Sequence, residues 1–243
     1  MSLLRFDRRD YASLHRLVSS GFMGVLIESP GVLGARSSTQ ALGQFAAGTD
    51  VYFSADVETD GPIPGPFSML SFALVYAGNF DGKVFHRPSK HDQSFYSELK
   101  PISAQFEIEA LRVNGLNRDR LLEHGQSPEE AMTAAGQWVK RSAGLGQPVL
   151  VAYPLSFDWT WLYWYFLQFS REGSPFDYSK CYDIKTAFAV KAGIPIGEAG
   201  RSKIEGFLKS GHPHTHHAVD DAIEQAELFA NIFEWKGGNG RVG

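Results

Sequence analysis

The sequence predicts an α/β protein with a mixed, five-stranded sheet flanked by helices. Strand-like apolar runs follow one another over residues 51–85, whereas strands and helices alternate from residue 128 onward. Strands that follow one another directly pair as antiparallel neighbours, and strands separated by a helix pair in parallel. The order of the elements therefore predicts a sheet that contains both kinds of pairing.

The antiparallel part of the sheet is expected to come first along the chain. Residues 51–58 predict one strand and residues 68–77 a second, separated by a loop rich in Pro and Gly at 61–66. A turn at 79–82 and the short apolar pair 84–85 predict a third strand that pairs with the second. Residues 106–113 and a short stretch from residue 117 are predicted to be helical, on either side of the turn at Asn114 and Gly115.

The parallel part begins with a helix that has a strong start signal. Ser127 is suited to cap it, Pro128 to occupy its first position, and the two acids that follow to interact with its dipole. Residues 148–152 form a continuous apolar run, which is typical of a buried central strand. We then expect an aromatic-rich helix over 157–169, a strand at 180–182, a helix to residue 191 and a last helix over 218–235.

Composition favours one main domain and excludes some classes of protein. The 243 residues are 43% hydrophobic, the net charge is −4, and there is one cysteine, Cys181. An acidic balance argues against tight, non-specific binding to many phosphates. A single cysteine allows no intrachain disulfide, and the longest early apolar run stops at Glu28, so we expect a cytoplasmic protein with no membrane span. Residues 1–48 are expected to be a loosely ordered or partly helical appendage, 49–236 the main domain, and 237–243 a flexible tail.

Two carboxylates at the end of the first strand are the main candidate for chemistry. Asp56 and Glu58 are two residues apart, so in a strand they point to the same face, about 6.5–7 Å apart along the chain. Like charges on an apolar element are unfavourable unless a cation lies between them, and oxygen ligands suit Mg²⁺ or Mn²⁺. The alternative is a strand that ends in two solvated acids.

Two further acids could complete such a site. Asp158 follows the buried strand and stands near the start of the aromatic helix, where an acid could equally serve the helix dipole. Asp221 shares the buried side of the last helix with Leu228 and Ile232, so its carboxylate needs a partner, whereas Asp220 is readily solvated.

One histidine has a suitable position beside these acids. His216 stands five residues before Asp221, and it can reach the same site only from a loop, because five helical residues do not share a face. Pro213 makes such a loop plausible on steric grounds. A zinc site formed by His212, His214, His216 and His217 is a rival interpretation that their spacing does not favour. For the other three histidines we expect a solvated polar loop.

Together these segments resemble the three motifs of the DnaQ-like (DEDDh) 3′→5′ exonucleases. The motifs are residues 56–59 (Asp-Val-Glu-Thr), 157–158 (Phe-Asp) and 216–222 (His-His-Ala-Val-Asp-Asp-Ala), and the resemblance covers about residues 55–235. Residues 113–116 (Val-Asn-Gly-Leu) resemble the segment between the first two motifs. Asn114 replaces the usual His there, and Tyr153-Pro154 replaces the usual His-Asn before the second motif.

The resemblance implies a ribonuclease H-like fold and two-metal hydrolysis of phosphodiester bonds in DNA or RNA from the 3′ end. It implies two Mg²⁺ or Mn²⁺ ions on Asp56, Glu58, Asp158 and Asp221, His216 as general base, and nucleic-acid 3′ ends, expected to be single-stranded, as partners. Thr59 and Asn114 are the implied substrate contacts.

Other functions remain open from the sequence. One is a catalytically weak, nuclease-like scaffold that binds a polymerase or an RNA-processing partner, and another is a phosphodiesterase of short oligonucleotides, which would suit the acidic chain. The aromatic helix could stack bases, although aromatic residues on all its faces favour a role in the core. A homodimer is also left open.

Overall fold

The computed structural model of the protein describes residues 42–238. These residues belong to one compact unit. The expected appendage at 1–48 and tail at 237–243 lie largely outside the described residues. Within them, no helix is long and apolar enough to cross a membrane.

The described chain contains six strands, six α-helices and three 3₁₀ turns. The strands are β1 (Asp50–Thr59), β2 (Met69–Phe80), β3 (Phe85–His86), β4 (Ser94–Glu98), β5 (Gln147–Ala152) and β6 (Cys181–Asp183). The helices are α1 (Ile108–Asn114), α2 (Arg118–His124), α3 (Pro128–Ala143), α4 (Leu155–Phe169), α5 (Ile184–Ala192) and α6 (Ala218–Glu234). The 3₁₀ turns Ile196–Glu198, Arg201–Lys203 and Gly206–Leu208 lie between α5 and α6.

The sheet is mixed, as predicted, and its strand order is β3-β2-β1-β5-β6 with β4 paired to β2. β1 runs antiparallel to β2 and parallel to β5, and β5 runs parallel to β6. The main path of the sheet has the five strands that were predicted, and β4 is an additional short strand that pairs with β2. Three of the five residues of β4 are polar and most are partly exposed, so it lacks the apolar pattern of a central strand.

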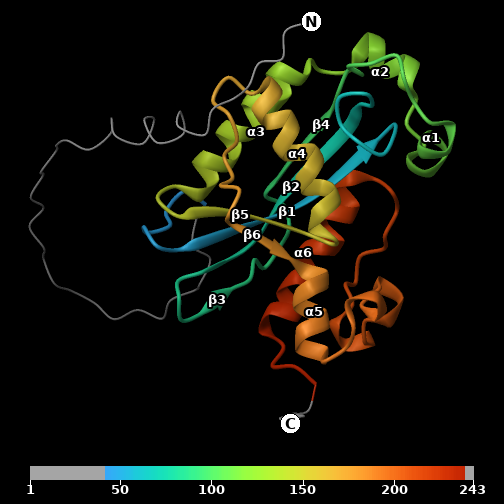
Figure 1. Cartoon of the computed structure of the whole chain (residues 1–243). Coiled ribbons are helices and arrows are strands. Elements are labelled where there is room, and N and C mark those ends of the chain that lie inside the picture. The colour runs from blue at the N-terminus through green and yellow to red at the C-terminus, as the bar shows by residue number, and fades with distance from the viewer. Residues whose placement is uncertain (1–41, 239–243) are drawn as a thin grey trace, which may run out of the picture. The chain divides into compact units, whose positions relative to one another are not determined.

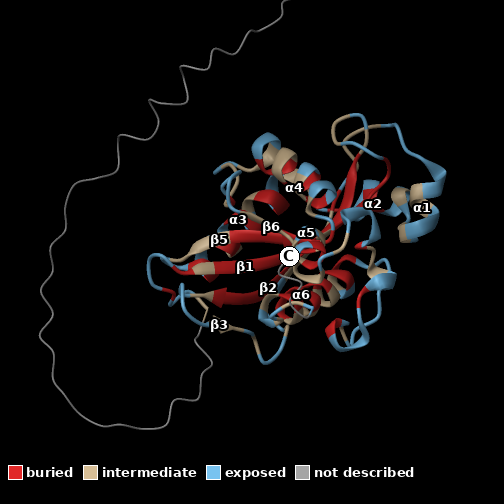
Figure 2. Cartoon of the chain, turned by 60° about the horizontal axis from the view of Figure 1, so that its bottom comes forward, coloured by how far each residue is buried: buried red, intermediate tan, exposed pale blue. Residues whose placement is uncertain are grey.

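The strands lie between two layers of helices. In Figure 2 the buried strands β1, β2 and β5 have α3 and α4 on one side and α6 on the other. Residues of β1 alternate between these layers: Phe53 packs in the cluster that contains α3 and α4, and Tyr52 in the cluster that contains α5 and α6. Phe45, which precedes the predicted start of the domain at residue 49, is buried in the first cluster.

Local signals in the sequence explain most helix boundaries. The Ser127 hydroxyl accepts a hydrogen bond from the Glu130 amide, Pro128 opens α3, and Gly144 ends it with a positive φ of 57°. The aromatic helix α4 begins at Leu155, two residues before its predicted start. Its residues Trp161, Tyr165 and Phe166 are buried, which confirms that much of this helix belongs to the core.

The connection from β4 to α3 extends beyond the sheet. Figure 1 shows α1 and α2 at one end of the molecule, next to the end of β1 and apart from the helices that cover the sheet. α1 has no buried residue, whereas α2 buries Leu121. The carboxyl end of β1 therefore lies beside an outlying helical segment.

Candidate active site

The first two acids lie at the end of β1 and face α6. Asp56 pairs with Ala73 and Glu58 with Ser71 in the antiparallel ladder with β2. Both have the strand parity of Tyr52, whose side chain packs in the α5 and α6 layer. Asp56 is partly buried, and Glu58 is only 9% exposed.

The third acid comes from the first turn of α6. Asp221 is 1% exposed, whereas its neighbour Asp220 is exposed, as the periodicity of this helix predicted. Carboxylate oxygens of Asp56, Glu58 and Asp221, one from each residue, all lie within 4.8 Å of one another. The fold thus brings acids from the two ends of the domain sequence into one group.

The fourth predicted acid stands next to this group but is not a member of it. Asp158 lies in the first turn of α4 and is 5% exposed. Its charge acts on Asp56 and on Glu58, which places it beside both carboxylates. Burial raises the pKa of Asp158, and the backbone N–H groups of Asp158 itself and of Val57 oppose this rise, so its carboxylate lies near Val57 of β1.

Burial makes Asp56, Glu58 and Asp158 reluctant to ionise, and the charges of neighbouring acids add to this effect for Asp56 and Glu58. Burial, followed by the charges of Asp158, Glu58 and Asp221, raises the pKa of Asp56 well above its ordinary value. Burial, then the charges of Asp221 and Asp158, raises the pKa of Glu58 to about 8. Burial also raises the pKa of Asp158 to about 7. Arg201 acts in the opposite direction on Asp56 and Asp158, but it does not reverse either change.

This group of acids fits a divalent cation. Three carboxylate oxygens from separate residues converge within 4.8 Å, and Asp158 adds negative charge beside them. A cation between the carboxylates would remove the repulsion that adds to the effect of burial on the pKa values of Asp56 and Glu58. Oxygen ligands of this kind are those that Mg²⁺ and Mn²⁺ prefer.

His216 lies in the loop before α6, as the sequence predicted. Its backbone N–H donates to Oδ2 of Asp221 at 3.0 Å, and the Thr215 N–H donates to Oδ1 at 2.8 Å. His216 has a positive φ of 60°, which is uncommon for a residue with a side chain. Hydrogen bonds to Asp221 thus hold the histidine loop beside the acids.

His214 is exposed, as expected for this loop, but it also has a buried partner. Its Nδ1 lies 3.0 Å from Oδ2 of Asp221, and its ring centroid is 4.7 Å from that of His216. The sequence signal for this arrangement was the spacing of His214 and His216, which are separated by one residue. His217 also has a partner, because its ring stacks on Tyr96 at 5.2 Å.

Gln225 is a second residue of the site that the sequence analysis missed. It is 1% exposed, and its Nε2 donates to Oδ1 of Asp56 at 2.8 Å. Its Oε1 accepts a hydrogen bond from the Tyr153 N–H at 2.6 Å. Gln225 stands four residues after Asp221 on α6, and this spacing on a helix was a signal that both share a face.

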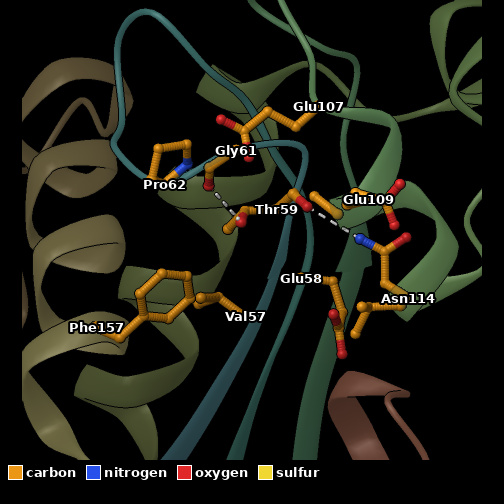
Figure 3. Close-up of a pocket in the computed structure, with 11 residues that line it drawn as sticks. Val57, Glu58, Thr59, Gly61, Pro62, Glu107, Glu109, Asn114 and Phe157 are labelled. Atoms are coloured by element: carbon orange, nitrogen blue, oxygen red, sulfur yellow. Dashed lines mark hydrogen bonds between the residues drawn. The ribbon is translucent and has the colours of Figure 1, made fainter.

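A pocket of about 390 Å³ opens beside Glu58, between the end of β1, the start of α4 and α1. In Figure 3 Phe157 and Asn114 lie on opposite sides of the pocket, with Thr59 between them. The lining residues are Val57, Glu58, Thr59, Gly61, Pro62, Glu107, Glu109, Ala110, Val113, Asn114 and Phe157. Phe157 is 41% exposed, so its ring is available at this surface.

Both predicted substrate contacts line this pocket, and each is held by the protein itself. The Thr59 hydroxyl donates to the Gly61 carbonyl at 2.9 Å. The Asn114 amide donates to the Thr59 carbonyl at 3.0 Å, and its oxygen accepts from the Leu116 N–H. α1 is therefore tied to the end of β1 through Asn114.

The two residues that depart from the motif before Phe157-Asp158 lie away from the pocket. Tyr153 is 6% exposed, its hydroxyl donates to the Ala199 carbonyl, and the Arg201 guanidinium lies 5.2 Å above its ring. Pro154 caps α4 without a side-chain hydrogen bond. Tyr153 thus joins β5 to the segment before α6, and it is not part of the pocket lining.

Solved structures share this fold. Exonuclease I of E. coli in complex with a dT13 oligonucleotide matches 77% of this chain and 41% of its own, with 12% identity and a TM-score of 0.52. A 3′-exonuclease that recognises the 3′ end of a histone mRNA stem-loop matches 79% and 84%, with 10% identity and a TM-score of 0.53. The chain spans less than half of exonuclease I, and at these identities the likeness establishes the fold alone. The protein thus has the ribonuclease H-like fold of the 3′-exonucleases.

A sequence relative gives the family. The 3′-5′ DNA exonuclease Cap18 of Escherichia coli is 33% identical over 184 residues, which are 75% of this chain and 91% of the relative. No protein-family model matches the chain. The chain belongs to the DnaQ-like 3′→5′ exonucleases, as the three motifs predicted.

Proposed function

We propose that the protein removes nucleotides from the 3′ end of DNA, using two divalent ions held by Asp56, Glu58, Asp158 and Asp221. The convergence of three carboxylates within 4.8 Å beside an open pocket is the observation that carries the proposal. Asp158 is assigned as the fourth ligand because its charge acts on both acids of β1. DNA is favoured over RNA because Cap18 is named a DNA exonuclease.

The residues of the chain divide the chemistry between them. When bound, Mg²⁺ or Mn²⁺ ions supply positive charge to the attacking and leaving oxygens of the phosphodiester. His216 is the proposed general base, since histidine is the side chain that most often transfers protons in enzymes and the loop places this one beside Asp221. Gln225 and the backbone of the histidine loop orient Asp56 and Asp221.

The pocket is the proposed place of the terminal nucleotide. Its volume of about 390 Å³ lies in the range of sites that hold small molecules. Val57, Pro62 and Phe157 provide apolar surface on which a base can pack, and the exposed Phe157 ring is available for stacking. Thr59 and Asn114 are the proposed polar contacts of this nucleotide.

Short oligonucleotides are a second candidate substrate class. The net charge is −4, and the lining of the pocket includes the acids Glu107 and Glu109 in addition to Glu58. A surface of this kind provides little attraction for a long phosphate backbone. A phosphodiesterase that prefers fragments of a few nucleotides would not need such attraction.

The test is a series of single-stranded DNA and RNA oligonucleotides of two to thirty residues, labelled at the 5′ end, with Mg²⁺ or Mn²⁺. Stepwise shortening of DNA from the 3′ end supports the proposal, and rates that peak at two to five residues support the short-fragment alternative. Asp56→Asn is the control for contaminating nucleases. Efficient release of internal fragments, or equal rates for the parent protein and Asp56→Asn, would overturn the proposal.

A further inference from the structure

Asp221 belongs to two groups of side chains whose ligand atoms lie close enough together to hold a metal ion. One is the group of acids with Asp56 and Glu58. The other consists of His214, His216 and Asp221, in which one ligand atom from each residue also lies within 4.8 Å of the others. The chemistry described above uses Asp221 as a ligand and His216 as the base, and it leaves His214 without a function.

The histidine loop presents its two imidazoles together. The His214 and His216 ring centroids are 4.7 Å apart with the planes at 71°, and Nδ1 of His214 lies 3.0 Å from Oδ2 of Asp221. Two backbone hydrogen bonds to Asp221, and one from the Thr215 hydroxyl to Asp220 at 2.9 Å, hold this loop on α6. Little rearrangement is therefore required for both rings to meet one ion. The side chain of His214 is 38% exposed, so the position is open to solvent.

The ligands of this second group favour a different metal from the one that the group of acids favours. Two imidazoles and one carboxylate are typical of Zn²⁺ sites with three protein ligands and a fourth position open to water. Mg²⁺ prefers oxygen ligands and seldom binds imidazole. We propose that His214, His216 and Asp221 form an inhibitory site for Zn²⁺ or a similar transition-metal ion.

Zinc bound at this site should inhibit hydrolysis because His216 and Asp221 belong to both sites. An imidazole that has given its lone pair to a metal has no free basic nitrogen, so His216 cannot accept a proton while it is a ligand. Asp221 is also drawn into the second site, which weakens its contribution to the group of acids. This consequence rests on the proposed function, whereas zinc binding itself does not.

Zinc binding is measured on the full chain by competition with a chromophoric chelator. The parent protein should bind one Zn²⁺ at this site, and His214→Gln should weaken the affinity at least about tenfold, the lower limit for disturbing a metal site. His212→Gln is the matched control, because His212 lies in the same loop and contacts Glu227 instead, at 3.4 Å. Equal affinities of the parent and His214→Gln, or a selective loss in His212→Gln, would overturn the proposal.

Inhibition is measured as the ratio of hydrolysis rates with and without buffered Zn²⁺, at saturating Mg²⁺, within each variant. The parent and His212→Gln should lose most of their activity at zinc concentrations that fill the site, and His214→Gln should require at least about tenfold more zinc. Full activity of the zinc-saturated parent would refute the inhibitory role. If the parent shows no Mg²⁺-dependent hydrolysis at all, the proposed function fails, and the binding measurement still decides whether the zinc site exists.

Discussion

The side-chain amide of Gln225 donates a hydrogen bond of 2.8 Å to Oδ1 of Asp56. The oxygen of the same amide accepts from the Tyr153 N–H, at the end of β5. One buried side chain on α6 therefore connects β1 to the turn that begins α4. Because β1, α4 and α6 carry the four acids, Gln225 fixes the orientation of Asp56 relative to the other three.

Gln225→Leu should weaken Mn²⁺ binding and lower kcat. The change removes the donor that orients Asp56 and leaves the Tyr153 N–H unpaired, which costs about 1–3 kcal/mol of stability. Asn231→Leu is the control, since Asn231 lies on the same helix and donates to the Leu208 carbonyl. Both variants should melt at lower temperature than the parent, but only Gln225→Leu should show a weaker Mn²⁺ affinity in calorimetry. Equal Mn²⁺ affinities of the two variants would contradict a role for Gln225 at the metal site.

The stability of the metal-free protein should fall as the pH rises from about 5 to about 8. The pKa of Glu58 is raised to about 8 and that of Asp158 to about 7, whereas unfolded Asp and Glu titrate near 4. The folded protein thus binds more protons than the unfolded chain between these values, and the stabilisation is lost as the pH passes the folded pKa. Thermal melting in EDTA should show this slope, and Glu58→Gln should reduce it.

Mg²⁺ should counteract this loss of stability at high pH. The ions compete with protons for the carboxylates, so the increase in melting temperature that Mg²⁺ produces should be larger at pH 9 than at pH 7. A Mg²⁺ effect that does not change with pH would indicate binding outside the group of acids.

Asp56→Asn should abolish hydrolysis without destabilising the metal-free protein. The substitution removes a charge that burial and three neighbouring acids disfavour, so the melting temperature in EDTA should equal or exceed that of the parent. The increase with Mn²⁺ should be lost. Asp50→Asn, at the opposite end of the same strand, should retain it. Unfolding of Asp56→Asn would show instead that this carboxylate is needed for the fold.

Asp158 should be needed for turnover, whereas Asp183 should contribute to stability. Oδ1 of Asp183 accepts from the Thr186 N–H at 2.6 Å, and its Oδ2 accepts from the Leu155 N–H at 2.6 Å, so it holds the starts of two helices. Asp183→Ala should lower stability by about 0.5–2 kcal/mol for each cap and retain turnover in the folded fraction. Asp158→Ala should eliminate turnover. The opposite pattern in urea unfolding and kinetics would reverse the two assignments.

Local patterns in the sequence were sufficient to predict how Asp56, Glu58 and Asp221 are oriented within their elements. The period of two in β1 predicted that Asp56 and Glu58 share a face, and the period of α6 predicted that Asp221 is buried while Asp220 is not. The offset between His216 and Asp221 predicted a loop before α6. Each of these relations depends on neighbouring residues within one element, which is the information that periodicity contains.

Relations between distant segments were not predictable in this way. Gln225 and Asp56 are 169 positions apart, and nothing near either residue indicates the other. His214 lies in a loop that is exposed as predicted, and its contact with the buried Asp221 is not indicated by any periodicity within one element. Strand β4 was missed because its polar, half-exposed residues are stabilised by pairing with β2 and less by burial.

His216, and not the adjacent His217, should act as the base. His216→Asn should lower kcat by about 10²–10⁴-fold, since the imidazole that accepts the proton is lost. Asparagine is chosen because it tolerates the positive φ of 60° and keeps the backbone N–H that donates to Asp221. The increase in melting temperature with Mg²⁺ should therefore survive. His217→Asn is the matched control: His217 stacks on Tyr96, so its loss should cost about 0.5–1.5 kcal/mol of stability and leave most of kcat. Equal losses of kcat in both variants, together with loss of the Mg²⁺ effect, would mean that the loop acts through its structure and that His216 is not the base.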